Sequence, residues 1–455
     1  MNRFKPYVPL LEKALQSLDA WRSSFGDVPG FQGPPEEDLA NVLLELGKKL
    51  EGNYPFHHPS YAGQMLKPPH PAAWLAYALT MTINPNNHAL DGGPPTSAME
   101  KEVIGKLAAM AGYNSSYLGH LTSAGTIANL EALFVAREVH PGKAIAATSN
   151  AHYTHRRMSK VLNTSFLEIP VDERGRPDFN FIKKNIMEIG TIVVTMGTTG
   201  LGYVEPLSQI LQLAEENSVR VHVDAAYGGF FKLISSDLPH QREWDEMGRA
   251  DSIVIDPHKH GLQPYGCGSV LYKDAAVGKF FKHDSPYTYF TSDDLHLGEI
   301  SLECSRAGAA AAALWATLEI LPLDENGLGG ILKKARSAAV KFAHLIEESS
   351  VYRLYNEPDL DIAGYFKIPK QEKISEINHL SEELFRKGVS DKKEGFHVSL
   401  FKIPAEEFCR KFPEFERDTD YAVILRSVLM KEEHEGFVEE LVRRLEKKAK
   451  VKGEK

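Results

Sequence analysis

Lys259 follows a predicted strand, at a position where a lysine could form a covalent bond with a ligand. It follows Ser252-Ile253-Val254-Ile255, a β-branched apolar run typical of a buried strand, after the connection Asp256-Pro257-His258. The carboxyl end of a strand is where open α/β sheets bind their ligands. Burying an amine is unfavourable unless its charge is paired or removed, and a Schiff base with a carbonyl group makes use of such an amine. Taken alone, Lys259 fits a solvated loop lysine better, so the interpretation needs a second residue.

Asp224 is that second residue, because it ends an alternating strand, Val219–Asp224, and is followed by small residues. Such a strand carries a carboxylate to the same edge of the sheet as Lys259. Pyridoxal phosphate requires both groups, a lysine to hold its aldehyde and a carboxylate to keep its pyridine nitrogen protonated. The small side chain of Ala226 would let a flat ring lie close to the backbone. On its own, Asp224 would be an ordinary cap after a strand.

Five segments of the chain, in the same order, resemble those of the pyridoxal-phosphate-dependent group II amino-acid decarboxylases, the family of the aromatic amino-acid and glutamate decarboxylases. The segments are Thr122-Ser123-Ala124-Gly125-Thr126, Asn150-Ala151-His152-Tyr153, Gly197-Thr198-Thr199, His222-Val223-Asp224-Ala225-Ala226 and Asp256-Pro257-His258-Lys259. With their flanks they run from about His58 to about Pro322, and the short prokaryotic branch is the most similar. The resemblance implies pyridoxal 5'-phosphate as the cofactor and a homodimer with active sites at the subunit interface.

The resemblance also implies how this cofactor is held. The implied cofactor-binding residues are Lys259, Asp224, Ala226, His152, Gly125, Thr126, Thr198, Thr199 and His258. Gly125 and Thr126 open a helix, and the free N–H groups of a helix start suit a phosphate group. His152 stacks on the ring in relatives and is also able to carry protons near neutral pH. Ile127 departs from the glutamate that relatives commonly have, which leaves the hydroxyl and amide donors unchanged.

Catalysis and substrate binding involve further residues by the same resemblance. Relatives have a tyrosine in the region 280–296 that returns a proton to Cα, which makes Tyr289 the first candidate and Tyr287 the second. Tyr61 and Gln64 correspond to a stretch near the substrate side chain. His258 is expected to reach the phosphate or the substrate carboxylate, and Arg306 is placed to pair an anion at the start of a helix.

The elements that position these residues follow from hydrophobic periodicity. Regular alternation of strand and helix patterns predicts a mostly parallel sheet with helices on both faces. The predicted strands are 144–148, 165–169, 191–196, 219–224, 252–256 and 269–272, and the helices between them are 125–139, 153–162, 179–187 and 206–216. Together with the resemblance, this pattern predicts an α/β protein with the type I pyridoxal-phosphate, aspartate-aminotransferase-like fold.

Two further regions flank the predicted sheet. Leucines at helical spacing in 7–20 and 37–50 predict an amino-terminal helical arm, which in relatives packs across a dimer. After a glycine-rich turn at 326–330, a helix at 331–349, strands at 361–368, 396–402 and 421–427, and a final helix from Glu432 to about Lys448 predict a smaller α/β domain. The expected division is an arm at 1–60, a large cofactor-binding domain at 61–325 and a small domain at 326–455.

Composition limits the classes of partner and location. A formal net charge of −9 argues against nucleic acid or an anionic membrane as the main partner. The most apolar stretch, 307–316, is too short to span a bilayer. Three separated cysteines suggest no disulfide framework, so we expect a cytoplasmic protein. The adjacent His57 and His58 lack the spacing of a zinc site, and no metal is expected.

The sequence therefore predicts a lyase that decarboxylates an L-amino acid to the corresponding amine and carbon dioxide. A carbon–carbon lyase acting on a phosphorylated amino alcohol is the alternative, because the Ser-Arg-x-Gly form around Arg306 also occurs in sphingosine-phosphate lyases. An aminotransferase is less favoured, since its usual carboxylate-binding arginine pattern is not apparent in the last domain. A catalytically silent relative would be expected to have lost Lys259 or Asp224, and both are present. The accepted side chain does not follow from the sequence.

Overall fold

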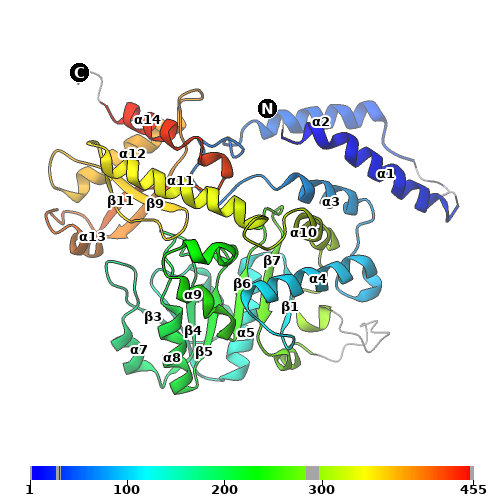
Figure 1. The fold of residues 1–455 in the computed structure, drawn as a ribbon, viewed down its shortest axis with the longest axis horizontal. Helices are drawn as coiled ribbons and strands as arrows, with labels where there is room; N and C mark the ends of the chain where they lie inside the picture. Colours follow the sequence, from blue (N-terminus) through cyan, green and yellow to red (C-terminus); the bar gives the residue numbers. More distant parts are fainter. Residues whose placement is uncertain (1–2, 27–29, 31, 283–296, 451–455) are drawn as a thin grey trace.

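Two β-sheets organise the chain (Figure 1), as seen in a computed structural model that describes residues 3–26, 30, 32–282 and 297–450. The larger sheet has the strand order β1-β7-β6-β5-β4-β2-β3, and the smaller has the order β10-β11-β9-β8. The strands of the larger sheet are β1 (Leu118–Thr122), β2 (Ala144–Thr148), β3 (Phe166–Ile169), β4 (Ile189–Thr195), β5 (Arg220–Asp224), β6 (Ser252–Ile255) and β7 (Gly268–Tyr272). Those of the smaller sheet are β8 (Tyr352–Leu354), β9 (Ile362–Lys367), β10 (Ser399–Pro404) and β11 (Tyr421–Val428).

The larger sheet is mostly parallel, which confirms the predicted architecture. Strands β2 to β6 pair in parallel, whereas β7 is antiparallel to both of its neighbours. The sequence did not indicate β1. The pairing of Asp224 with Val254 sets the register of β5 against β6. Because these two strands are parallel neighbours, the residues that follow them emerge at the same edge of the sheet.

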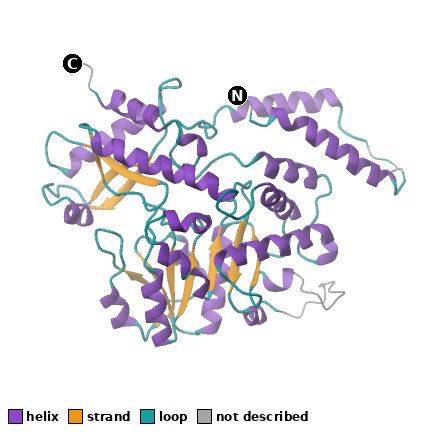
Figure 2. Cartoon of the chain, in the orientation of Figure 1, coloured by secondary structure: helices purple, strands orange, loops and turns teal. Residues whose placement is uncertain are grey.

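Helices cover both faces of the larger sheet, as the purple ribbons on either side of its strands show (Figure 2). They are α3 (Pro71–Met81), α4 (Pro94–Ala111), α5 (Gly125–Val139), α6 (Thr154–Val161), α7 (Phe179–Asn185), α8 (Leu207–Asn217), α9 (Gln241–Asp245) and α10 (Gly308–Ile320). Successive strand residues point to opposite faces, so Ile253 and Ile255 join the core on one face while Val254 joins a separate core on the other. A strand that is buried on both faces has to be apolar throughout, which explains the continuous apolar run before Lys259.

The smaller sheet packs against α11 (Leu328–Glu348), α12 (Ile374–Val389) and α14 (Val438–Ala449), and α13 (Ala405–Lys411) follows β10. Its strands β9, β10 and β11 were predicted, but β8, α12 and α13 were not. The prediction of a continuous helix from Glu432 is wrong, because a short 3-10 turn at Glu432–His434 precedes α14, which begins at Val438. Gly436 lies in the gap, and glycine is a poor helix former.

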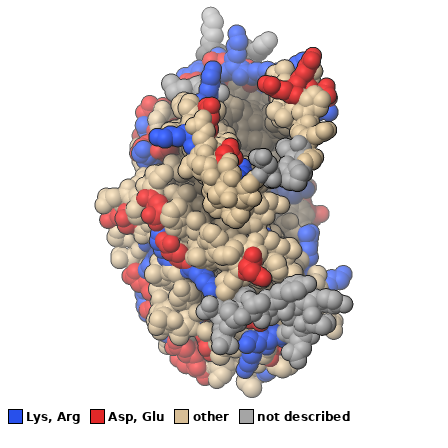
Figure 3. All heavy atoms as spheres, turned by 90° about the vertical axis from the view of Figure 1, so that its right-hand side faces the viewer, with Lys and Arg blue, Asp and Glu red and all other residues tan. Residues whose placement is uncertain are grey.

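The amino-terminal arm consists of α1 (Val8–Ser23) and α2 (Glu36–Leu50), which extend beside the rest of the chain as two helices (Figure 1). None of their described residues is buried. The exposed large apolar side chains of these helices are Val8, Leu10, Trp21, Leu39, Val42, Leu43, Leu44, Leu46 and Leu50. Viewed from the side to which the arm extends, uncharged residues cover much of the middle of the molecule (Figure 3). Within the described ranges, every helix is too short or too polar to cross a bilayer.

Candidate active site

Lys259 follows β6 through the connection 256–258, at the carboxyl edge of the larger sheet. Its backbone N–H donates to the carbonyl of Asp256 at 2.9 Å, which closes a turn. In this turn its Nζ lies 3.1 Å from Asp256 Oδ2, and 21% of its side chain is exposed. Nδ1 of His258 donates to the carbonyl of Cys267 at 2.7 Å, which holds the turn against the start of β7. The amine is therefore fixed in place and still accessible from a cavity.

Asp224 ends β5 and is buried. Its Oδ2 accepts a hydrogen bond from His155 Nε2 at 2.8 Å, and its Oδ1 accepts one from the backbone N–H of Ala226 at 3.1 Å. Burial by itself would raise the pKa of Asp224, but the hydrogen bond and charge of His155, together with Lys259, hold it well below its ordinary value. Asp224 is therefore an oriented, ionised carboxylate.

Lys259 and Asp224 line one cavity of about 210 Å³. The predicted residues that line it are Gly125, Thr126, His152, Thr199, Asp224, Ala226, His258 and Lys259. His152 and Thr199 also line a neighbouring cavity of about 410 Å³, which extends between the larger and the smaller sheet. Nδ1 of His152 is 2.7 Å from the hydroxyl of Thr154, and burial lowers the pKa of His152.

The start of helix α5 forms one wall of the smaller cavity. The first N–H groups of any helix have no acceptor within the helix, so this wall suits an anion. An added Cβ at Gly125 would collide with the Asp256 carboxylate, so the glycine lets this carboxylate lie against the helix start. The Asp256 carboxylate thus packs between the helix start and Lys259, and its Oδ1 is buried with no described partner. This position agrees with an orienting role for Asp256 in the turn.

Thr198 and Thr199 take different positions although they are adjacent. Thr198 is buried, and its hydroxyl accepts a hydrogen bond from the backbone N–H of Tyr203 at 3.0 Å. It lines only the larger of the two cavities, whereas Thr199 lines both. The side chain of Thr198 therefore stabilises the loop after β4.

Tyr61 and Gln64 line neither of the two cavities. Tyr61 is buried in an aromatic group with Tyr54, Phe56 and His397. Gln64 is exposed and contributes a backbone hydrogen bond to the Tyr61 side chain. Within a single copy of the chain, neither residue lines the cavity that Lys259 faces.

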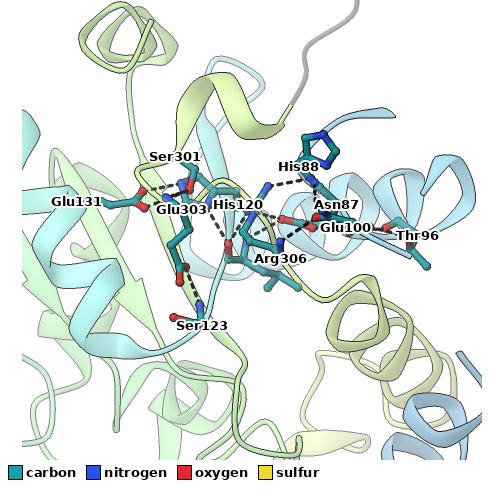
Figure 4. Close-up of polar contacts among 12 residues, drawn as sticks. Asn87, His88, Thr96, Glu100, His120, Ser123, Glu131, Ser301, Glu303 and Arg306 are labelled. Carbon is teal, nitrogen blue, oxygen red and sulfur yellow. Dashed lines mark hydrogen bonds and ion pairs between the residues drawn. The ribbon is translucent and has the colours of Figure 1, made fainter. Parts of the chain in front are cut away.

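Arg306 lies in a separate cluster (Figure 4), and although it was predicted to pair a substrate anion, it lines neither of the two cavities described above. Its Nη1 lies 3.0 Å from Glu100 Oε1 and donates to the carbonyl of Leu121 at 2.7 Å. Nη2 donates to the carbonyl of Asn87 at 3.2 Å. The anion that Arg306 pairs is therefore Glu100 of α4, and the guanidinium ties the start of α10 to α4 and β1.

The same cluster reaches the helix start that faces the smaller cavity (Figure 4). The backbone N–H of Ser123 donates to Glu303 Oε2 at 2.8 Å. Nearby, His120 Nε2 lies 2.8 Å from Glu131 Oε2, and the backbone N–H of Leu302 donates to the other oxygen of Glu131 at 3.0 Å. These contacts fix the chain after residue 296 against β1 and α5. The candidate proton donors Tyr287 and Tyr289 lie outside the described residues.

Two residues at the site were missed by sequence reasoning. His155 occupies the first turn of α6, and nothing near it in sequence indicates its partner Asp224. Arg426 of β11 lines the larger cavity and donates to the carbonyls of Gly200 at 2.6 Å, Thr199 at 2.7 Å and Gly63 at 3.2 Å. No signal in the sequence indicated Arg426, because its position on β11 is set by the packing of the smaller sheet against the loop after β4.

The site combines a lysine, an ionised carboxylate and a helix start around one cavity. It lies on a mostly parallel sheet that is covered on both faces. Together these features define a pyridoxal-phosphate enzyme of the type I fold. The residues fit the cofactor, because the amine suits its aldehyde, the carboxylate suits its pyridine nitrogen and the N–H groups of the helix start suit its phosphate. The model of the pyridoxal-dependent decarboxylase conserved domain matches residues 52–365. The chain therefore belongs to the pyridoxal-dependent decarboxylase family.

Individual relatives agree with this assignment. The chain is 28% identical to an L-tyrosine decarboxylase of Enterococcus faecium, over 83% of this chain and 82% of that protein. It is 25% identical to an L-2,4-diaminobutyrate decarboxylase of Acinetobacter baumannii, over 82% and 80%. The crystal structure of mouse CSAD has a TM-score of 0.79 at 21% identity, covering 96% of this chain and 92% of that one, and shares the fold. The protein is a pyridoxal-phosphate-dependent amino-acid decarboxylase, and the alternative of a carbon–carbon lyase is not favoured.

Proposed function

We propose that Lys259 holds the cofactor of this decarboxylase and that Asp224 faces the pyridine nitrogen of the same ring. The observation that carries this proposal is that both groups line one cavity from the ends of adjacent parallel strands. When bound, pyridoxal phosphate supplies an electron sink for the carbon–carboxylate bond that breaks. The protein's part is to orient the reacting bond and to exclude competing reactions.

The surrounding residues have complementary roles in this proposal. Gly125 and Thr126 direct N–H groups at the phosphate, and His152 lies along one face of the ring. Arg426 supplies positive charge for the carboxylate of the amino acid, since it lines the adjoining cavity and its hydrogen bonds go to neutral backbone carbonyls. Tyr289 or Tyr287 remains the candidate that returns a proton to Cα.

The test of this function uses the purified protein and its absorbance spectrum. A visible band from the lysine-bound cofactor is expected, together with carbon dioxide release from one or a few of the twenty amino acids and of L-2,4-diaminobutyrate. L-tyrosine, L-aspartate and L-2,4-diaminobutyrate come first, because relatives are named for them. A preparation that shows the band but releases amine from none of these compounds would contradict the proposed reaction.

His155 is expected to contribute through Asp224. Replacing His155 with phenylalanine removes the hydrogen bond to Asp224 Oδ2, and hydrogen bonds to charged groups are the stronger ones. We expect kcat to fall roughly 10- to 100-fold with little change in KM, since a bond of this kind is worth roughly 1.5–3 kcal/mol. The matched variant His155→Gln keeps an N–H donor and should retain most of the activity. Equal losses in both variants would show that His155 acts through packing alone.

We further propose a homodimer in which the amino-terminal arm covers a second copy of the chain. The support is the set of exposed apolar side chains on α1 and α2. An exposed apolar patch of this kind marks a surface that a partner covers. The division into an arm (1–60), a large domain (61–325) and a small domain (326–455) and the cytoplasmic location stay predictions from the sequence.

Replacing Leu43 with glutamate tests this dimer, because a charge on the apolar side of α2 opposes its burial. Sedimentation velocity of the wild-type protein is expected to give twice the chain mass, and Leu43→Glu should raise the dimer dissociation constant at least tenfold. Glu45→Lys, on the polar side of the same helix, is the control and should leave the dimer intact. A wild-type protein that sediments as a monomer at micromolar concentration would refute the proposal.

A further inference from the structure

Asp361 is a buried carboxylate that lies between the two sheets. It directly precedes β9 of the smaller sheet. Its Oδ1 accepts a hydrogen bond from the hydroxyl of Tyr227 at 2.5 Å, and its Oδ2 lies 3.1 Å from His260 Nε2. Asp361 and His260 have no exposed surface, and Tyr227 is 3% exposed. The carboxylate of a residue from the smaller sheet thus contacts two side chains of the larger one.

The two partners of Asp361 belong to the two segments that carry the active-site acid and amine. Tyr227 stands three residues after Asp224, and His260 directly follows Lys259. The rings of Tyr227 and His260 also touch each other, edge to face, with centroids 4.7 Å apart. One carboxylate therefore bridges the segments that follow β5 and β6, at the edge of the sheet that holds Asp224 and Lys259.

The smaller sheet fixes Asp361 independently of these two partners. The backbone N–H of Leu429, which follows β11, donates to the carbonyl of Asp361 at 2.8 Å. The backbone of Asp361 is thereby held between β9 and the end of β11. Because the backbone of Asp361 is held in this way, its carboxylate restricts the positions of the Tyr227 and His260 side chains.

The ionised form of Asp361 is favoured in spite of its burial. Burial would raise its pKa, but His260, Tyr227 and the charge of Lys67 hold the pKa of this carboxyl below its ordinary value. The other cations that face it are Arg336 and Arg426. A buried charge of this kind favours one geometry of its partners, because moving the Tyr227 hydroxyl away leaves Oδ1 without its donor, and moving His260 away removes a nearby ion-pair partner of Oδ2.

We propose that Asp361 is a positioning residue that acts through Tyr227 and His260 to set the placement of Asp224 relative to Lys259. Cofactor affinity then depends on contact between the smaller sheet and the cofactor-binding edge of the larger one. The inference rests on the proposed roles of Lys259 and Asp224, and it goes beyond them by assigning a function to a carboxylate that lines neither cavity.

The test compares Asp361→Asn and Tyr227→Phe with the control Tyr365→Phe. Tyr365 is a buried tyrosine of β9 whose hydroxyl is 3.1 Å from Ser427 Oγ, so its variant also removes one buried hydroxyl from an internal bond, away from Asp361. Each protein, freed of cofactor, is titrated with pyridoxal phosphate, and the visible band of the loaded protein is followed against pH. We expect the cofactor Kd to rise about tenfold in Asp361→Asn and in Tyr227→Phe, and the pH midpoint of the band to shift. Both quantities should stay at the wild-type value in Tyr365→Phe.

The outcome that overturns the inference is a wild-type Kd and midpoint in Asp361→Asn and Tyr227→Phe, with a loss of melting temperature like that of Tyr365→Phe. Asp361 would then only join the two sheets. If Asp361→Asn fails to fold, Tyr227→Phe decides the question alone, because it removes a single oxygen atom. A wild-type protein without any visible band would instead overturn the assignment of Lys259, and the inference with it.

Discussion

Replacement of Lys259 by alanine is expected to abolish the visible band of the bound cofactor and to lower kcat by roughly 10³-fold or more. The reason is that the structure provides Lys259 as the amine at the carboxyl edge of β6, facing the cavity that Asp224 also lines. The loss should appear in kcat and in cofactor retention together, since the same amine holds the cofactor and is placed to move protons. Carbon dioxide release and absorbance spectra measure the two effects.

Lys273→Ala is the matched control for this experiment. Lys273 directly follows the neighbouring strand β7, is exposed, and donates to the carbonyl of Arg249 at 3.3 Å. We expect wild-type activity and a normal band from this variant. Turnover of Lys259→Ala at the wild-type rate would refute the proposed site, whatever the control shows.

Asp224→Asn is expected to lower kcat by roughly 10²- to 10³-fold, a loss comparable to that of other preorganised electrostatic groups. An amide carries no negative charge and cannot keep the pyridine nitrogen protonated. The fold should survive, because the amide oxygen still accepts the hydrogen bond from the backbone N–H of Ala226 or from His155. Single-turnover measurements with saturating cofactor separate this loss from weaker binding.

The pH dependence of the wild-type enzyme provides a second measurement on Asp224. Its folded-state pKa lies below that of an unfolded aspartate, about 3.9. Its ionised form therefore stabilises the fold above that pH, and this contribution is lost as the pH falls through the folded-state value. Between about pH 5 and pH 9, a range well above this value, the activity profile should contain no titration of Asp224.

Asp251→Asn is the control for Asp224→Asn. Asp251 precedes β6 and accepts a hydrogen bond from the backbone N–H of Val221 at 2.8 Å, at the opposite edge of the same strand pair. It is expected to change stability slightly and kcat very little. If Asp224→Asn retained more than about half of the wild-type kcat, the assignment of Asp224 to the pyridine nitrogen would fail.

The local pattern of the chain indicated most strands of the larger sheet and the two residues that follow or end β6 and β5 at its carboxyl edge. Val219–Asp224 and Ser252–Ile255 are short apolar runs with β-branched residues, and strand–helix alternation around them requires parallel neighbours. Parallel strands end at one edge of a sheet, so Asp224 and Lys259 were expected at the same edge, and the structure shows that β5 and β6 are neighbours there. Gly125 was predicted from the family resemblance together with its place at the start of a helix.

Only the tertiary structure decided which distant side chains complete this edge. His155 is 69 residues from Asp224 in sequence, and Asp361 is 134 residues from Tyr227, so no local period links either pair. Arg306 shows the converse, since its sequence position suggested an anion site while the fold supplied Glu100 as its partner. Hydrophobic periodicity specifies which face of an element is buried, but a buried polar group takes whichever partner the packing of other elements brings within hydrogen-bond distance.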